Sequence, residues 1–209
     1  MNLPNKLTLF RIILVPIMVI VFFFDIPGSF LGISTTMWIM ELIFIIASIT
    51  DKLDGYLARK NNQVTNFGKF LDPIADKILV VAAMILFVEM GRLPAWIPII
   101  VIFREFAVSG YRLIAVQNSG KVIAANVWGK LKTVTQMIAI ILMFLTTQPY
   151  FAFVMRAKTE QDALVNSALT YMTTGDFVMN ILASIFMTIS VIATIFSGYE
   201  YLKGGKDLL

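Results

Sequence analysis

The chain has 209 residues, of which 58% are hydrophobic and only 14% are charged, and its mean hydropathy is +0.83. Soluble globular domains are about half apolar and about a quarter charged, so this composition excludes a disordered chain and argues against a water-soluble enzyme. The lack of cysteine and histidine excludes disulfides, thiolate catalysis, Ser-His-Asp triads and histidine metal ligands, while the net charge of +4 suits an anionic membrane surface or substrate.

Long apolar runs separated by short turns indicate an all-α integral membrane protein. A membrane-crossing helix needs about 20 residues, so the length accommodates about six spans. We expect helices at 12–24, 37–50, 70–90, 95–116, 131–146 and 177–201, with 7–11 leading into the first and the second continuing to Arg59. Strands are not expected, because the short alternating pattern of barrel strands is missing. The predicted fold is six transmembrane helices with a short amino-terminal interfacial segment, forming one membrane domain over 1–209, and the connection 150–176 is expected to be a loop with a short interfacial helix.

The basic residues predict how the chain is oriented. With six spans both termini lie on one side, and that side receives every Lys and Arg except Arg92, Arg156 and Lys158. Cytoplasmic loops of membrane proteins carry an excess of Lys and Arg. We therefore expect a multi-pass protein of the cytoplasmic membrane, with both termini and the segments 51–77 and 104–132 facing the cytoplasm.

Four aspartates stand at the cytoplasmic ends of the second and third apolar segments. Asp51 and Asp54 are three residues apart and Asp72 and Asp76 are four apart, so each pair shares one face of a helix. Antiparallel neighbours joined by a short polar turn can bring all four carboxylates together, where they repel one another unless cations compensate. Hard divalent ions such as Mg²⁺ or Mn²⁺ prefer such oxygens, and two of them can clamp the oxygens of a phosphoryl transfer.

Small residues beside these acids leave room for a ligand close to the backbone. Gly55 and Ala58 lie near the face of Asp54, and Gly68 lies one turn before Asp72. The alternative is that the acids cap helices, pair with neighbouring cations or line an ion pathway. A single aspartate near a helix end favours that alternative, whereas four at fixed spacing favour a functional site.

The pattern D-x2-D-G-x2-A-R-x8-G-x3-D-x3-D runs from Asp51 to Asp76 without departure and resembles the signature of the CDP-alcohol phosphatidyltransferases. The stretches 4–11, 104–112 and 129–133 resemble the bacterial branch of this family that makes phosphatidylglycerophosphate. The resemblance implies a six-helical homodimer whose site opens to the cytoplasm. It also implies transfer of a phosphatidyl group from CDP-diacylglycerol to an alcohol with release of CMP, a step of phospholipid biosynthesis.

The resemblance also implies roles for individual residues. Asp51, Asp54 and Asp72 correspond to metal ligands, and Asp76 corresponds to the general base for the acceptor hydroxyl and is counted among the metal ligands as well. The residues that match the CDP-diacylglycerol site are Asn5, Thr8, Gly55, Ala58, Arg59, Thr65 and Gly68. A carboxylate base agrees with the composition, because the chain has no histidine or cysteine.

Cations in the fourth and fifth segments point to an anionic acceptor. Charges at membrane depth are costly and need a partner, and neighbouring residues such as Arg104 and Glu105 point about 100° apart on a helix. This favours an acceptor-phosphate pocket over a structural pair with snorkelling residues, and glycerol 3-phosphate fits such a pocket. Inositol phosphate, serine and phosphatidylglycerol remain alternatives. The residues expected in this pocket are Arg11, Arg104, Arg112, Lys130 and Lys132, although Arg11 is equally compatible with marking the membrane interface.

Two other classes of protein compete with a membrane enzyme. A transporter could use the acids as an ion pathway, but such folds show internal repeats and this sequence has none. A membrane scaffold gives no reason to gather four carboxylates. Metal-dependent CMP release separates the enzyme from both, and the expected partners are the two substrates, membrane lipids and a second copy of the chain, with no nucleic acid.

Overall fold

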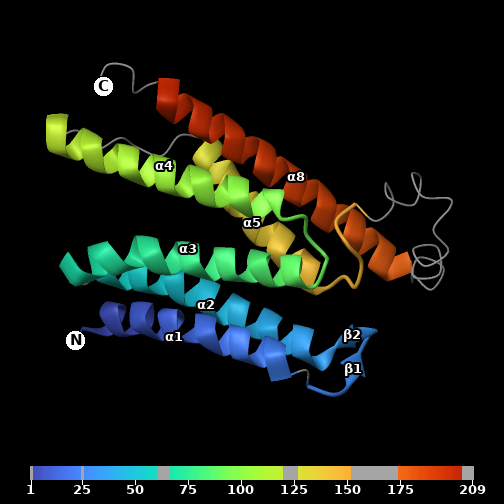
Figure 1. The fold of residues 1–209 in the computed structure, drawn as a ribbon. Helices are drawn as coiled ribbons and strands as arrows, with labels where there is room; N and C mark the ends of the chain where they lie inside the picture. The colour runs from blue at the N-terminus through green and yellow to red at the C-terminus, as the bar shows by residue number, and fades with distance from the viewer. Residues whose placement is uncertain (1, 25, 61–65, 120–126, 152–173, 204–209) are drawn as a thin grey trace. The chain divides into compact units, whose positions relative to one another are not determined.

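The computed structural model describes residues 2–24, 26–60, 66–119, 127–151 and 174–203. It gives the backbone alone for 52, 58–59, 66–70, 72–73, 76, 112–119 and 202. The helices of the described residues are α1 (Leu3–Phe24), α2 (Thr35–Lys60), α3 (Asn66–Glu89), α4 (Trp96–Ser119), α5 (Val127–Phe144) and α8 (Thr174–Lys203), shown in Figure 1. Each of the six apolar segments therefore corresponds to a helix. Most of the connection expected at 150–176 lies outside the described residues.

The residues expected to lead into the first apolar segment are helical and belong to the same helix. Helix α1 runs without interruption from Leu3 to Phe24, with Pro16 inside it. Pro4 suits the first turn, where a missing N–H group costs no hydrogen bond. Asn5, Thr8 and Arg11 are buried in this helix, so the chain packs here against other protein.

A small hairpin between α1 and α2 corrects the expectation of no strands. Strand β1 (Ser29–Phe30) pairs antiparallel with β2 (Ile33–Ser34) through a two-residue loop. Both loop residues have positive φ, 54° at Leu31 and 79° at Gly32, as a type I′ turn requires. Such turns usually contain Asn-Gly or Asp-Gly, so the Leu-Gly sequence gave little signal.

The described helices form two compact units, and the first contains residues 1–90 with 144–147. Within it α1 packs against α2 and α3, and α2 contacts α3, as Figure 1 shows. Phe144 joins the core of this unit, with its ring centroid 5.9 Å from that of Phe44 and 4.8 Å from that of Phe87. The contact between α2 and α3 matters for function because both carry the aspartate motif.

The second unit contains residues 91–143 with 148–209, and in it α4 packs against α8. The first half of α8 is joined to the segment after α5 by polar contacts. Asn180 donates from Nδ2 to the carbonyl oxygens of Gln148 and Pro149, and the hydroxyls of Tyr150 and Thr188 lie 2.8 Å apart. Burial raises the pKa of Tyr150, so the phenol is neutral at ordinary pH. These contacts hold the chain in place and show no arrangement suited to chemistry.

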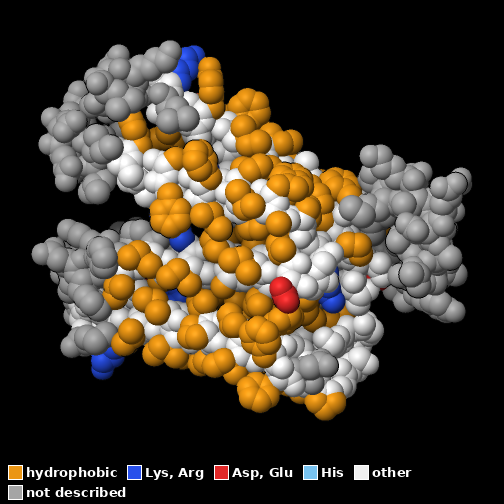
Figure 2. Space-filling model, viewed as in Figure 1, with side chains coloured by type: hydrophobic (Ala, Val, Ile, Leu, Met, Phe, Trp, Pro, Cys, Tyr) orange, Lys and Arg blue, Asp and Glu red, His pale blue; other side chains and the backbone are white. Residues whose placement is uncertain are grey.

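The chain is a multi-pass membrane protein. Three helices among the described residues are long and apolar enough to cross a bilayer: Leu3–Phe24, Val127–Phe144 and Thr174–Tyr201. Large hydrophobic side chains are exposed along the helices, and they cover much of the face drawn in Figure 2 with few charges between them. Surfaces of this kind are stable against lipid and rare on soluble monomers.

Candidate functional site

In the first unit, one turn of α1 and one turn of α2 bring together four polar side chains. Arg11 donates from Nη1 to Asp51 Oδ1 at 2.6 Å and from Nη2 to Asp54 Oδ2. The hydroxyl of Thr8 lies 3.2 Å from Asp54 Oδ2 and also 3.2 Å from the carbonyl oxygen of Pro4. Thr8 and Arg11 are one turn apart on α1, and Asp51 and Asp54 are one turn apart on α2, so the contacts match residues at helical spacing.

The side chains of this group differ in how deeply they are buried. The side chain of Arg11 has no exposed surface and that of Asp54 is 4% exposed, whereas that of Asp51 is 38% exposed. Arg11 gives the buried carboxylate of Asp54 both a hydrogen bond and a positive charge beside it. Asp54 is therefore the inner acid of the site, and Asp51 lies where a molecule from outside the unit can reach it.

The second aspartate pair follows on α3. Residues 72 and 76 lie one turn apart within Asn66–Glu89, and α3 contacts α2. The side chains of Asp72 and Asp76 lie outside the described set, and among the side chains that are described no three acidic groups gather. The helical spacing expected from the sequence is confirmed for both pairs, and the meeting of all four carboxylates stays a prediction.

Residues expected at the nucleotide site are distributed over the same three helices. Asn5 is buried on α1 one turn before Thr8, and Gly55 follows Asp54 on α2. The backbones of Ala58 and Arg59 belong to the last turns of α2. Gly68 belongs to the first turn of α3, and Thr65 lies outside the described residues. The motif therefore sits where α2 ends and α3 begins.

Basic side chains in the second unit gather around one acid. Glu105 accepts through Oε1 from Arg104 Nη1 at 2.9 Å and also from Lys132 Nζ. Arg104 and Glu105 do pair with each other although they are neighbours in the chain, so the sequence argument against this pair is wrong. Both side chains are long enough to bend toward a common point. Lys132, 27 residues farther along, completes the cluster from α5.

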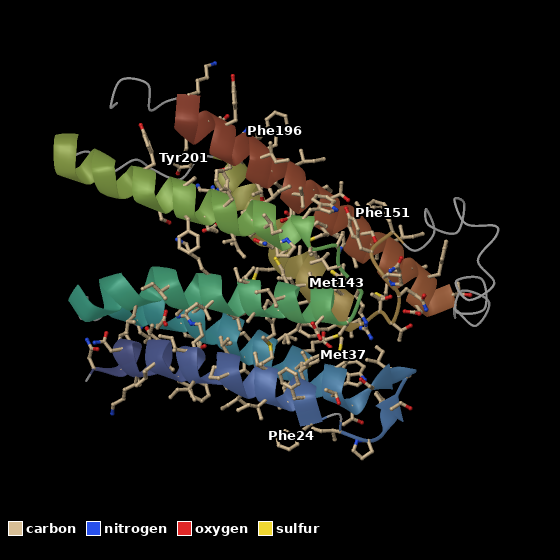
Figure 3. The ribbon with its side chains drawn as sticks, in the orientation of Figure 1. Phe24, Met37, Met143, Phe151, Phe196 and Tyr201 are labelled. Carbon is tan, nitrogen blue, oxygen red and sulfur yellow. The ribbon has the colours of Figure 1, made fainter. Side chains whose placement is uncertain are left out.

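This basic cluster also contacts α8. Arg104 donates from Nη2 to the hydroxyl of Ser197, and its guanidinium lies 5.9 Å from the ring centroid of Tyr201. Figure 3 labels Tyr201 on α8 together with Phe196, which stacks on Trp128 at 5.0 Å. Ser197 is 93 residues away from Arg104 in the chain, and no local sequence pattern reveals such a distant partner.

Charge and hydrogen-bonding capacity in this cluster favour a negatively charged ligand. Arg104 and Lys132 bring two positive charges and Glu105 brings one negative charge, so the cluster has net positive charge. Nε of Arg104 is buried and has no hydrogen-bond partner among the described residues. Lys130 is exposed two residues before Lys132, and the side chain of Arg112 lies outside the described set. The structure thus brings together two of the expected acceptor residues.

Arg11 was expected either with these cations or at the membrane interface. Its side chain is completely buried within the protein and is paired with Asp51 and Asp54. The structure places its guanidinium on the carboxylates of the first unit.

Comparison with known proteins identifies the family. Residues 1–197 match the family model described as CDP-alcohol phosphatidyltransferase. The chain is 50% identical to the CDP-diacylglycerol–glycerol-3-phosphate 3-phosphatidyltransferase of Bacillus subtilis, over 71% of this chain and 79% of the relative. It is 48% identical to the protein of the same name from Haemophilus influenzae over 66% and 73%. It is also 33% identical to that from Rickettsia typhi over 98% and 97%. The aspartate motif, the helices that carry it and these similarities agree, and the chain belongs to the CDP-alcohol phosphatidyltransferase family.

Proposed function

We propose that this protein transfers a phosphatidyl group from CDP-diacylglycerol to sn-glycerol 3-phosphate, giving phosphatidylglycerophosphate and CMP. The observation that carries the proposal is the complete aspartate motif on two helices in contact, α2 and α3, within a family whose similar members bear the name of this reaction. The net positive cluster of Arg104 and Lys132 supports an acceptor that carries a phosphate.

The donor set of the motif fits divalent metal ions. Asp51 and Asp54 lie on one face of α2, and carboxylate oxygens are the ligands that Mg²⁺ and Mn²⁺ prefer in proteins. Asp51, Asp54, Asp72 and Asp76 would hold Mg²⁺ or Mn²⁺, two ions in all. Bound metal would neutralise the pyrophosphate and the departing CMP.

The reaction that we propose is a single in-line displacement. The hydroxyl oxygen of glycerol 3-phosphate forms a bond to the β-phosphorus of CDP-diacylglycerol, and the bond from that phosphorus to the CMP oxygen breaks. Asp76 takes the proton of the attacking hydroxyl. The nucleotide is held by Asn5, Thr8, Gly55, Ala58, Arg59, Thr65 and Gly68, and the acceptor phosphate by Arg104, Arg112, Lys130 and Lys132.

The proposal includes the membrane topology and the oligomeric state of the enzyme. The chain forms one membrane domain of six spans in a bacterial cytoplasmic membrane, with both termini and the site facing the cytoplasm, and it works as a homodimer. The distribution of Lys and Arg along the sequence supports this orientation.

The test is CMP release from CDP-diacylglycerol by the purified full chain with Mg²⁺ or Mn²⁺. Parallel reactions receive glycerol 3-phosphate, serine, inositol phosphate or phosphatidylglycerol. We expect release with glycerol 3-phosphate alone, its loss in Asp76→Asn or with a chelator, and normal activity in Glu89→Gln, which changes an exposed acid on the same helix. Release of CMP with another acceptor would overturn the acceptor assignment. No release with any acceptor would overturn the proposal that the protein is this enzyme.

A further inference from the structure

We propose that Arg11 and Thr8 are positioning residues that hold Asp51 and Asp54 in the orientation that binds metal. This inference deepens the proposed function and rests on it. It assigns Arg11 to the carboxylate site in place of the acceptor-phosphate role that the sequence suggested, and it gives Thr8 a contact with Asp54 in addition to the nucleotide contact proposed above.

Contacts of Arg11 identify it as a bridge between the two acids. One guanidinium nitrogen donates to Asp51 Oδ1 and the other to Asp54 Oδ2, so a single planar group fixes the separation of two carboxylates. The guanidinium is rigid and presents its donors as a fork, whereas the lysine ammonium is a single point on a flexible stem. Only arginine can therefore hold both acids in one geometry.

Burial excludes a role for Arg11 at a surface. Its side chain has no exposed area, and it faces a carboxylate that is itself 4% exposed. An acceptor phosphate would have to displace two carboxylates to reach this guanidinium. An internal position is suited instead to orienting groups that do touch a ligand, and the outer acid, Asp51, is the one with exposed surface.

Thr8 adds a second support from the same helix. Its hydroxyl lies 3.2 Å from Asp54 Oδ2, the oxygen that also accepts from Arg11. The hydroxyl has one proton, which it shares between Asp54 Oδ2 and the carbonyl oxygen of Pro4, so it adds to the contact from Arg11 in restricting the rotation of this carboxylate. Hydrogen-bond partners that orient metal ligands commonly change metal affinity about 10- to 100-fold when they are lost.

The experiment measures Mn²⁺ binding to the purified full chain by the loss of the free Mn²⁺ signal in electron paramagnetic resonance. Arg11→Lys keeps the charge and removes the fork, and we expect Mn²⁺ binding to weaken about tenfold or more. The KM for glycerol 3-phosphate at saturating metal should stay within about twofold of the unchanged protein, because Arg11 does not touch the acceptor. Lys6→Arg is the matched control, because Lys6 is exposed on the same helix.

Unchanged Mn²⁺ binding in Arg11→Lys would overturn the proposal, and a raised KM for glycerol 3-phosphate with unchanged Mn²⁺ binding would return Arg11 to the acceptor. If Arg11→Lys does not fold, the comparison of Thr8→Val with Thr8→Ser decides. Serine keeps the hydroxyl and should bind Mn²⁺ normally, whereas valine should bind several-fold more weakly; equal binding would overturn the proposal. The Mn²⁺ measurement tests this inference without depending on the transfer reaction. A failure of the proposed reaction itself would be seen separately, as a lack of CMP release by the unchanged protein.

Discussion

Removing the carboxylate of Glu105 tests whether it neutralises the basic cluster of the second unit. Its Oε1 atom accepts from Arg104 at 2.9 Å and from Lys132, and the three side chains are only 12%, 17% and 7% exposed for Arg104, Glu105 and Lys132. In Glu105→Ala both cations stay in a largely dry environment without this partner. The change should therefore destabilise the fold far more than the loss of a surface charge.

The size of the effect follows from burial and from the contacts that remain. Breaking a buried ion pair by removing one partner costs about 3–5 kcal/mol. Arg104 keeps Ser197 and the ring of Tyr201, so we expect a loss of about 3 kcal/mol, the lower end of that range. For a chain of this length each kcal/mol lowers the melting temperature by roughly 2–4 °C, which gives a decrease of about 6–12 °C.

The assay is thermal unfolding of the full chain in detergent, followed by tryptophan fluorescence at one heating rate, because such unfolding is often irreversible. Glu105→Gln keeps an oxygen that can accept from both cations and should lose less stability. Glu89→Ala removes an exposed acid and should change stability by about 0.5 kcal/mol or less. If Glu105→Ala had the same melting temperature as Glu89→Ala, the two cations would not depend on Glu105, and the reasoning from burial would be refuted.

Three further changes test other parts of the structure. Phe144→Ala removes a buried ring between two phenylalanines and should cost about 3–5 kcal/mol by thermal unfolding, whereas the exposed Phe24→Ala should cost little; similar losses would refute the packing. Gly28→Ala places a Cβ 2.9 Å from Thr35 Oγ1 at a φ of +116° and should lower the free energy of unfolding by roughly 1–3 kcal/mol. An unchanged melting temperature would contradict this, because it would mean that the turn relaxes around the new side chain. Burial raises the pKa of Tyr150, so stability should be full below about pH 10 and decline above it, and Tyr150→Phe should reduce that decline; an identical pH profile would contradict it.

Local patterns in the sequence determined the helices and the family. Each apolar run became a helix, as the match between the expected 70–90 and the observed Asn66–Glu89 illustrates, because the length and hydrophobicity of a run act on the backbone locally. The spacing of Asp51 and Asp54 on one face follows from helical geometry alone. The motif from Asp51 to Asp76 was sufficient to indicate the family, which the comparisons confirmed.

Only the tertiary structure decided which charges meet. The partners of Arg11 are 40 and 43 residues away, and those of Glu105 include Lys132 on another helix. Such pairs depend on which helices pack together and in what register, and composition and periodicity do not specify either. The sequence argument about Arg104 and Glu105 failed for a related reason: it followed the direction of each Cβ, whereas long side chains can bend to meet a neighbour. Local chemistry thus determined the elements and the motif, and packing determined which charged side chains pair.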